Sequence, residues 1–263
     1  MKKEIYQLTY ELEEKYWWYV ARRKIILDQL QSLLNNIKGR TPSLLDIGCG
    51  TGKNLTAFLK FSEAYGIDSS MEAIQFCLKR GLTNIALQDL SKDHLRENPF
   101  GKKFDFITML DVVEHIDDDV QCLSTISKWL TEEGLLFLTV PAYQWLWSGE
   151  DYISYHVRRY SRKHLAEIVR KAGFVIEKIS YFNTFLFPAQ ALVILFNRVF
   201  SAKSKTQSNL QEMPEFINSI LQKIMSAESP LLKQMDFPLG GSILCICRKI
   251  EEKTMIEKEL TRE

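Results

Sequence analysis

Residues 44–52, Leu-Leu-Asp-Ile-Gly-Cys-Gly-Thr-Gly, constrain the fold of this chain more than any other segment. A short apolar run ends there in glycines at alternate positions, and a helical pattern begins at Lys53. Because glycine has no Cβ, such a turn lets the backbone lie close to a ligand, and the free N–H groups of the following helix face that ligand. The spacing is G-x-G-x-G, whereas the dinucleotide fingerprint is G-x-G-x-x-G. The segment predicts a ligand site of the nucleotide type after the first strand.

Expected strands and helices alternate over residues 44–181. Three of the helical patterns are followed by a glycine, at Gly81, Gly134 and Gly173, which is typical of a helix end. Such alternation predicts an α/β fold, with a parallel sheet and helices on both of its faces. The expected strands are 44–47, 64–68, 84–89, 104–110, 135–140, 174–181 and 242–248.

Polar residues follow several of these strands. Ligands of an open parallel sheet bind beyond the carboxyl ends of its strands, so the glycine turn, Asp68, Asp89 and Leu110 are expected to line one crevice. A carboxylate such as Asp68 suits the two hydroxyls of a ribose, and Asp89 suits the exocyclic amine of adenine. Lys53-Asn54 replaces the Lys-Ser/Thr pair of a P-loop. The pattern therefore predicts a ligand with ribose and adenine and without a triphosphate.

In order and spacing, these segments resemble the successive motifs of class I S-adenosylmethionine-dependent methyltransferases. The resembling segments, within residues 43–140, are Leu45–Gly52, Gly66–Asp68, Gln88–Leu90 and Leu110–Ile116. The resemblance implies a Rossmann-like doubly wound sheet of seven strands, mostly parallel with the last antiparallel. It implies S-adenosyl-L-methionine as cofactor, contacted by Asp46, Gly48, Cys49, Gly50, Gly52, Asp68, Ser69, Asp89, Leu90 and Leu110.

The resemblance also implies methyl transfer to a small-molecule or lipid-linked acceptor by in-line displacement at the sulfonium. This step needs alignment and a dry site, and an oxygen or nitrogen acceptor can also need a base. His115 and His156 are the candidate bases, and a structural hydrogen bond is the alternative for His115. Residues 155–161 resemble, more loosely, a segment of bacterial methyltransferases of quinone, lipid or polysaccharide biosynthesis.

A metal site is not predicted. Asp111, Glu114 and His115 resemble the metal constellation of ubiquinone-pathway O-methyltransferases, but the same letters occur in metal-free relatives. Cys49 is expected to be a small buried residue rather than a nucleophile.

Three other functions compete with this interpretation. A non-catalytic S-adenosylmethionine-binding subunit stays open, and the glycine spacing disfavours a nicotinamide-dependent oxidoreductase. A nucleic-acid partner is not expected, because the net charge is only +1 and the Asn/Asp-Pro-Pro-aromatic and Pro-Cys motifs of nucleic-acid methyltransferases are missing. Five scattered cysteines and an N-terminus without a signal-peptide core predict a cytoplasmic location.

The chain is expected to divide into an N-terminal helical lid (1–40), a methyltransferase domain (41–250) and a charged tail (251–263). Residues 3–37 carry one long helical pattern with room for one break. Its aromatic residues either pack on the domain or cover the glycine turn. In the second case Trp17 and Arg22 contact the cofactor.

Two further segments bear on the acceptor. Residues 142–160 are expected to form a loop whose side chains contact it, among them Trp145, Trp147, His156, Arg158 and Arg159. Within a helical insertion at 183–240, residues 184–200 are apolar but short for a bilayer span. A buried helix, an apolar acceptor channel and peripheral membrane contact stay open for them, and the oligomeric state is not predicted.

Overall fold

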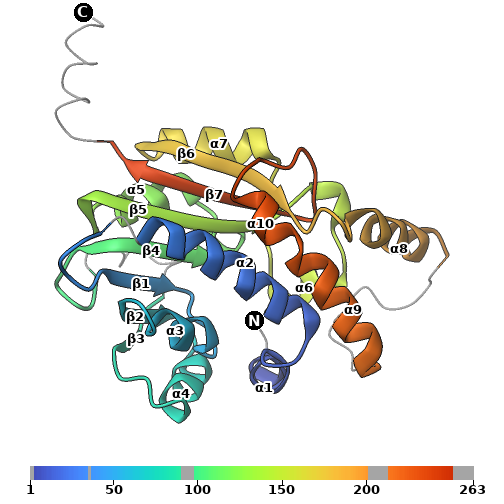
Figure 1. Cartoon of the computed structure of the whole chain (residues 1–263), viewed down its shortest axis with the longest axis horizontal. Coiled ribbons are helices and arrows are strands. Elements are labelled where there is room, and N and C mark those ends of the chain that lie inside the picture. Colours follow the sequence, from blue (N-terminus) through green and yellow to red (C-terminus); the bar gives the residue numbers. More distant parts are fainter. Residues whose placement is uncertain (1–2, 35–36, 90–97, 201–212, 251–263) are drawn as a thin grey trace, which may run out of the picture.

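The computed structural model describes residues 3–34, 37–89, 98–200 and 213–250 (Figure 1). Its strands are β1 (Ser43–Ile47), β2 (Glu63–Asp68), β3 (Ile85–Leu87), β4 (Phe104–Leu110), β5 (Leu130–Pro141), β6 (Phe174–Phe182) and β7 (Ser242–Lys249). Within the described residues they form one seven-stranded sheet in the order β3-β2-β1-β4-β5-β7-β6. Strands β1 to β5 pair in parallel, and β7 is antiparallel to β5 and β6. The predicted Rossmann-like α/β sheet with an antiparallel last strand is confirmed.

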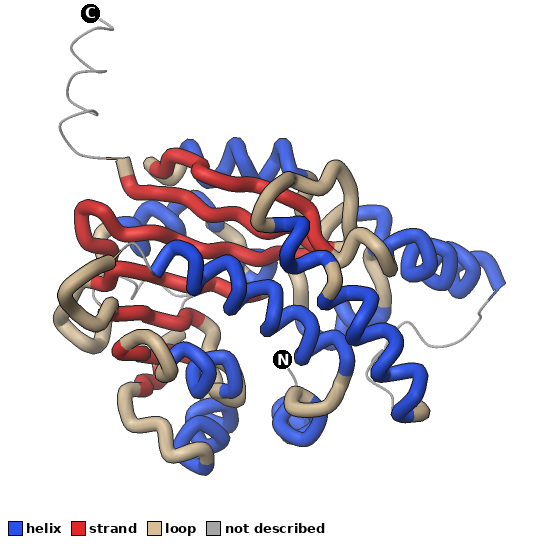
Figure 2. The backbone as a smooth tube through the Cα atoms, viewed as in Figure 1, coloured by secondary structure: helices blue, strands red, loops and turns tan. Residues whose placement is uncertain are grey.

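Helices cover both faces of this sheet (Figure 2). In Figure 1, α2 crosses the near face, whereas α5 and α7 lie behind the sheet. Every residue of β1 and β4 is buried, as expected for parallel strands covered on both sides. The helices are α1 (Lys3–Leu12), α2 (Trp17–Leu34), α3 (Lys53–Phe58), α4 (Met71–Lys79), α5 (Asp119–Ser127), α6 (Gly149–Ser154), α7 (Arg162–Lys171), α8 (Phe187–Phe200), α9 (Glu215–Ser226) and α10 (Glu228–Leu232), with the short 3-10 helices η1 (Val113–His115) and η2 (Gln144–Leu146).

The N-terminal helical pattern breaks once, between α1 and α2. Helix α2 buries Ile25, Ile26 and Leu30 in the main core. Helix α1 packs on α4 instead, where Tyr10 stacks on Phe76 with ring centroids 4.7 Å apart. The two helices therefore connect the sheet to the region beside the glycine turn.

The region around Gly134 differs from the prediction, because α5 ends at Ser127 and Gly134 lies inside β5. The register between β4 and β5 shifts here, so that Phe104 pairs with Leu130 and Phe106 with Leu135. A Cβ at Gly134 would lie 2.9 Å from Leu130 Cβ. The glycine is needed for this close approach within the strand and does not end a helix.

Residues 142–160 are also more ordered than the expected loop, since they contain η2 and α6. Helix α6 begins with a capping box, in which Asp151 accepts a hydrogen bond from the Ser148 backbone N–H at 2.7 Å. The Ser148-x-x-Asp151 pattern is a weak form of a known helix-start signal, and the sequence analysis missed it.

The insertion contains α8, α9 and α10. Of the alternatives left open for residues 184–200, a buried helix does not fit, because Leu192 and Phe196 of α8 are 68% and 60% exposed. Among the described residues, no helix combines the length and apolar character needed to cross a membrane. The predicted charged tail lies outside the described residues.

Candidate active site

A cavity of about 620 Å³ lies at the carboxyl ends of β1, β2 and β4. Its walls come from the N-terminal helices, the glycine turn, the segment after β4, the α6 region and α8. It brings together most of the predicted site residues: Trp17, Arg22, Gly48, Cys49, Gly50, Asp68, Ser69, Asp89, Leu110, His115 and His156. Asp46 and Gly52 are not among its lining residues, and Leu90 lies outside the described residues.

The glycines of the turn have different physical roles. Gly48, Gly50 and Gly52 all have positive φ, which glycine adopts without strain. A Cβ at Gly48 would lie 2.5 Å from Val112 Cγ2, whereas a Cβ at Gly50 would meet no atom within 4 Å. Gly50 thus leaves open space beside the backbone, where a ligand can approach. Gly52 is the N-cap of α3 and packs against the side chains of α4 and the following turn.

Two buried carboxyl groups lie at this turn, and one of them bonds to it. Asp68 accepts hydrogen bonds from Gly50 N at 2.8 Å and from Ser70 N at 2.9 Å. Beneath it Asp46 accepts a hydrogen bond from Thr108 Oγ1 at 2.6 Å, and burial raises the pKa of Asp46 to about 7. Asp68 therefore faces the cavity, while Asp46 lies one layer behind it.

Cys49 lines the cavity but is not an activated nucleophile. Its Sγ lies 3.9 Å from Cys77 Sγ. The contact with Cys77 and burial raise the pKa of the Cys49 thiol well above its usual value, so the nucleophilic thiolate is disfavoured.

Helix α2 closes the cavity with a cation and an aromatic residue. Arg22 Nη2 lies 2.9 Å from Asp111 Oδ2 and donates to Thr139 Oγ1 at 2.8 Å. Within the described part of the chain, Arg22 Nε and Trp17 Nε1 are buried donors without a hydrogen-bond partner. Since buried donors are almost always paired in native proteins, both fit a polar ligand in the cavity.

Arg80 ties the N-terminal helices to the glycine turn, a role that no sequence pattern predicted. Its guanidinium lies 2.7 Å from Glu13 Oε1 and donates from Nε to the Thr51 carbonyl at 2.9 Å. It also stacks over the Tyr10 ring at 4.3 Å.

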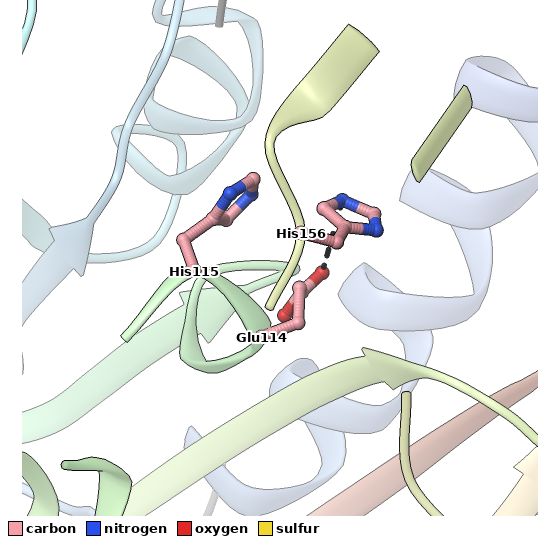
Figure 3. A group of neighbouring side chains, drawn as sticks. All are labelled: Glu114, His115 and His156. Atoms are coloured by element: carbon pink, nitrogen blue, oxygen red, sulfur yellow. Dashed lines mark ion pairs between the residues drawn. The ribbon is translucent and has the colours of Figure 1, made fainter. Parts of the chain in front are cut away.

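Glu114, His115 and His156 form a cluster in the lining of the cavity (Figure 3). The first two follow β4 in η1, and His156 comes from the segment after α6. The imidazole rings of His115 and His156 are 4.7 Å apart and perpendicular, and Glu114 Oε1 lies 3.9 Å from His156 Nε2. Among the described residues, neither carboxylate oxygen of fully buried Glu114 has a hydrogen-bond partner.

The cluster has the residue types of a divalent-metal site. Its potential ligand atoms lie within 4.8 Å of one another, and imidazole and carboxylate ligands suit several divalent metals. The absence of a metal stays a prediction. Burial raises the pKa of Glu114 well above its usual value, and burial with the neighbouring His156 lowers the pKa of His115 to about 4.

Asp151 orients His156 and was missed by the sequence analysis. Its Oδ1 lies 2.8 Å from His156 Nδ1, and both of its oxygens accept hydrogen bonds from Arg159. Although burial opposes ionisation, the hydrogen bonds from His156 and Arg159 hold the pKa of Asp151 far below its usual value. An ionised Asp151 favours the tautomer with the proton on Nδ1, which leaves Nε2 as an acceptor.

Of the other residues expected to contact the acceptor, one lines the cavity and three do not. Arg159 lines the cavity while it pairs with Asp151, whereas Trp145, Trp147 and Arg158 are not among the lining residues. Arg158 pairs with Asp119 at 2.6 Å instead.

A family model described as a methyltransferase domain matches residues 17–179. The ubiquinone biosynthesis O-methyltransferase of Actinobacillus pleuropneumoniae is 29% identical over 139 residues, which cover 48% of this chain and 58% of that relative. The chain thus spans little more than half of that relative's length.

Two solved structures resemble the chain in fold. The plantazolicin methyltransferase BpumL in complex with SAH superposes with a TM-score of 0.58 at 18% identity, over 94% of this chain and 90% of that one. The [4+2]-cyclase SpnF does so with a TM-score of 0.50 at 20% identity, over 84% of this chain and 80% of that one. At these identities the likeness concerns the fold alone. Because a cyclase shares this fold, the fold does not fix the reaction, which has to be inferred from the site.

Proposed function

The chain belongs to the methyltransferase-domain family, and we propose that it transfers a methyl group from S-adenosylmethionine to a small-molecule acceptor. The observation that carries this proposal is the cavity at the ends of β1, β2 and β4, where the glycine turn, Asp68 and Asp89 meet. The domain division and the cytoplasmic location expected from the sequence are part of the proposal.

The residues of the cavity fit this cofactor. Both oxygens of Asp68 accept backbone hydrogen bonds, and because a carboxylate offers about four acceptor sites, capacity remains for the ribose hydroxyls. Asp89 would bind the adenine amine, with Leu110 beside the adenine. The open space at Gly50 and the buried donors of Trp17 and Arg22 suit the methionine portion.

The cofactor would supply a methyl group bonded to a positively charged sulfur, and the protein would supply alignment, dryness and a base. The N-terminal helices line one side of the cavity, and their cover would help to keep water from the sulfonium, which favours displacement there. His156, oriented by Asp151, presents Nε2 to accept the proton of an acceptor hydroxyl. His115 is the second candidate base, because its lowered pKa keeps it neutral near pH 7.

We assign the acceptor atom to oxygen, in line with the name of the curated relative. Ile194 and Gln190 of α8 line the same cavity, so an acceptor with an apolar part, including a lipid-linked one, would fit. A non-catalytic cofactor-binding subunit and an oxidoreductase find no support in the comparisons.

Isothermal titration calorimetry with S-adenosylmethionine, S-adenosylhomocysteine and NAD tests the cofactor. We expect S-adenosylmethionine and S-adenosylhomocysteine to bind and NAD not to bind. Binding of NAD but of neither of the other two would contradict the proposal. Release of S-adenosylhomocysteine in the presence of hydroxylated aromatic acceptors then tests turnover. Tight binding without turnover of any acceptor would favour the non-catalytic subunit.

A further inference from the structure

Helix α8 exposes an apolar face to its surroundings. The exposed residues from 188 to 196 are all apolar: Pro188, Ala189, Leu192, Val193, Leu195 and Phe196. The polar residue of this stretch, Gln190, lies on the inward side and lines the cavity. A helix that faces water normally carries its polar residues outward. This distribution indicates that the outward face of α8 meets an apolar environment.

The apolar surface continues beyond α8. Helix α9 exposes Phe216 by 76%, and also Ile217 and Ile220. Both helices lie at the same end of the molecule in Figure 1, beyond the carboxyl ends of the parallel strands. Since Ile194 of α8 also lines the cavity, the apolar surface adjoins the candidate active site.

The charge and the aromatic residues near α8 indicate what covers it. Arg198 of α8 is basic and exposed, which complements an anionic lipid surface. Trp145 is 43% exposed and lies beside α8, since Arg198 donates to the Trp145 carbonyl at 2.7 Å. Tryptophan and tyrosine are the side chains enriched at membrane–water interfaces.

A second protein molecule fits this face less well. Protein interfaces carry about one hydrogen bond per 100–200 Å², and the outward side chains of α8 from 188 to 196 offer no donor or acceptor. Insertion among lipid chains requires no such partner.

We propose that α8 docks on an anionic bilayer surface, with Leu192, Val193, Leu195 and Phe196 inserted below the headgroups. The contact is peripheral and places the cavity beside the lipid phase, from which an apolar acceptor would enter. The entry of the acceptor rests on the proposed function, whereas the docking itself does not.

The test is vesicle flotation of the full chain, without cofactor or acceptor. The variant is Leu192→Gln/Phe196→Gln, because glutamine keeps helix propensity and removes the apolar side chains. The matched control is Leu78→Gln, which changes a leucine of α4 that is 58% exposed, against 68% for Leu192. Wild type and control should float with vesicles of equal parts phosphatidylcholine and phosphatidylglycerol, and the double variant should bind at least about tenfold more weakly. Thermal unfolding and S-adenosylmethionine calorimetry check that the double variant is folded.

Flotation of the double variant equal to wild type, or no flotation of wild type, would overturn the proposal. So would wild-type dimerisation in light scattering that the double variant loses, because α8 would then bind a second copy. Equally tight binding to pure phosphatidylcholine would overturn its electrostatic part. If wild type floats with the vesicles but does not bind S-adenosylmethionine, only the proposed function is refuted.

Discussion

The Arg22 guanidinium lies 2.9 Å from the Asp111 carboxylate and so joins helix α2 to the end of strand β4. Arg22 is buried and also donates to Thr139 of β5, and Asp111 has a positive φ of 60°. One cation therefore fixes the N-terminal helices over two strand ends at the cavity. It does so with its Nη2 atom, while Nε has no partner among the described residues.

Arg22→Ala should weaken both the fold and cofactor binding. The Asp111 carboxylate loses its charged partner, which we expect to cost about 2 kcal/mol of unfolding free energy. Removal of the buried donor and of the cover over the cavity should weaken S-adenosylmethionine binding about tenfold or more. Urea unfolding and calorimetry measure the two effects. Lys24→Ala, which removes an exposed ion pair of the same helix, should change neither by much, and equal effects of both variants would contradict the assignment.

Asp68→Ala should remove most S-adenosylmethionine binding. The variant lacks both carboxylate oxygens at the proposed ribose site, and two charge-assisted hydrogen bonds account for about a hundredfold in affinity. Calorimetry measures the loss. Glu63→Ala, at the exposed start of the same strand, is the matched control. Wild-type affinity of the Asp68 variant would show that the cofactor does not use this carboxylate.

His156→Ala and Asp151→Asn should lower turnover while cofactor affinity stays close to that of wild type. The first variant removes the proposed base and the second its orienting partner, and loss of a general base reduces kcat about 10²- to 10⁴-fold. The readouts are S-adenosylhomocysteine release and its pH profile, which a purely structural defect would not reshape. His164→Ala, which changes a histidine stacked on Tyr160, should retain activity. Normal turnover by the His156 variant would show that His156 is not the base. Either His115 would then be the base, or the reaction would need none.

Protonation of His115 should lower the free energy of unfolding in mild acid. Its pKa is lowered from 6.5 to about 4 in the folded protein, so the unfolded chain takes up its proton first. The stabilisation from neutral, half-buried His115 is complete above about pH 6.5 and is lost as the pH falls toward 4. The total loss is of the order of 3 kcal/mol.

The measurement is urea unfolding of wild type and His115→Gln at pH 7 and pH 5. Asp46 has a raised pKa of about 7 and contributes with the opposite sign, so the prediction concerns the difference between the two proteins. Wild type should lose more stability than the variant between these pH values. An identical pH dependence of both proteins would contradict a His115 that stays neutral in the folded state.

The sequence by itself determined the sheet and the half of the site that the sheet carries. The apolar run before Gly48 predicts a strand buried on both sides, and three alternating glycines predict a turn with positive φ. Because the carboxyl ends of parallel strands share one edge, Asp68, Asp89 and Leu110 had to come together there. These features follow from local backbone and burial preferences, which a short stretch of sequence contains.

Tertiary structure decided the side-chain partners from distant segments. Arg22 meets Asp111, and Glu114 meets His156, because the N-terminal helices and the segment after β5 pack against the same strand ends. Gly134 could be read as a helix end or as a close contact, and only the register of β5 against β4 separates the two. The apolar residues of 184–200 predict a helix, but whether it faces core or surroundings depends on which elements cover it. Such long-range packing is a property of the whole chain, so no local pattern contains it.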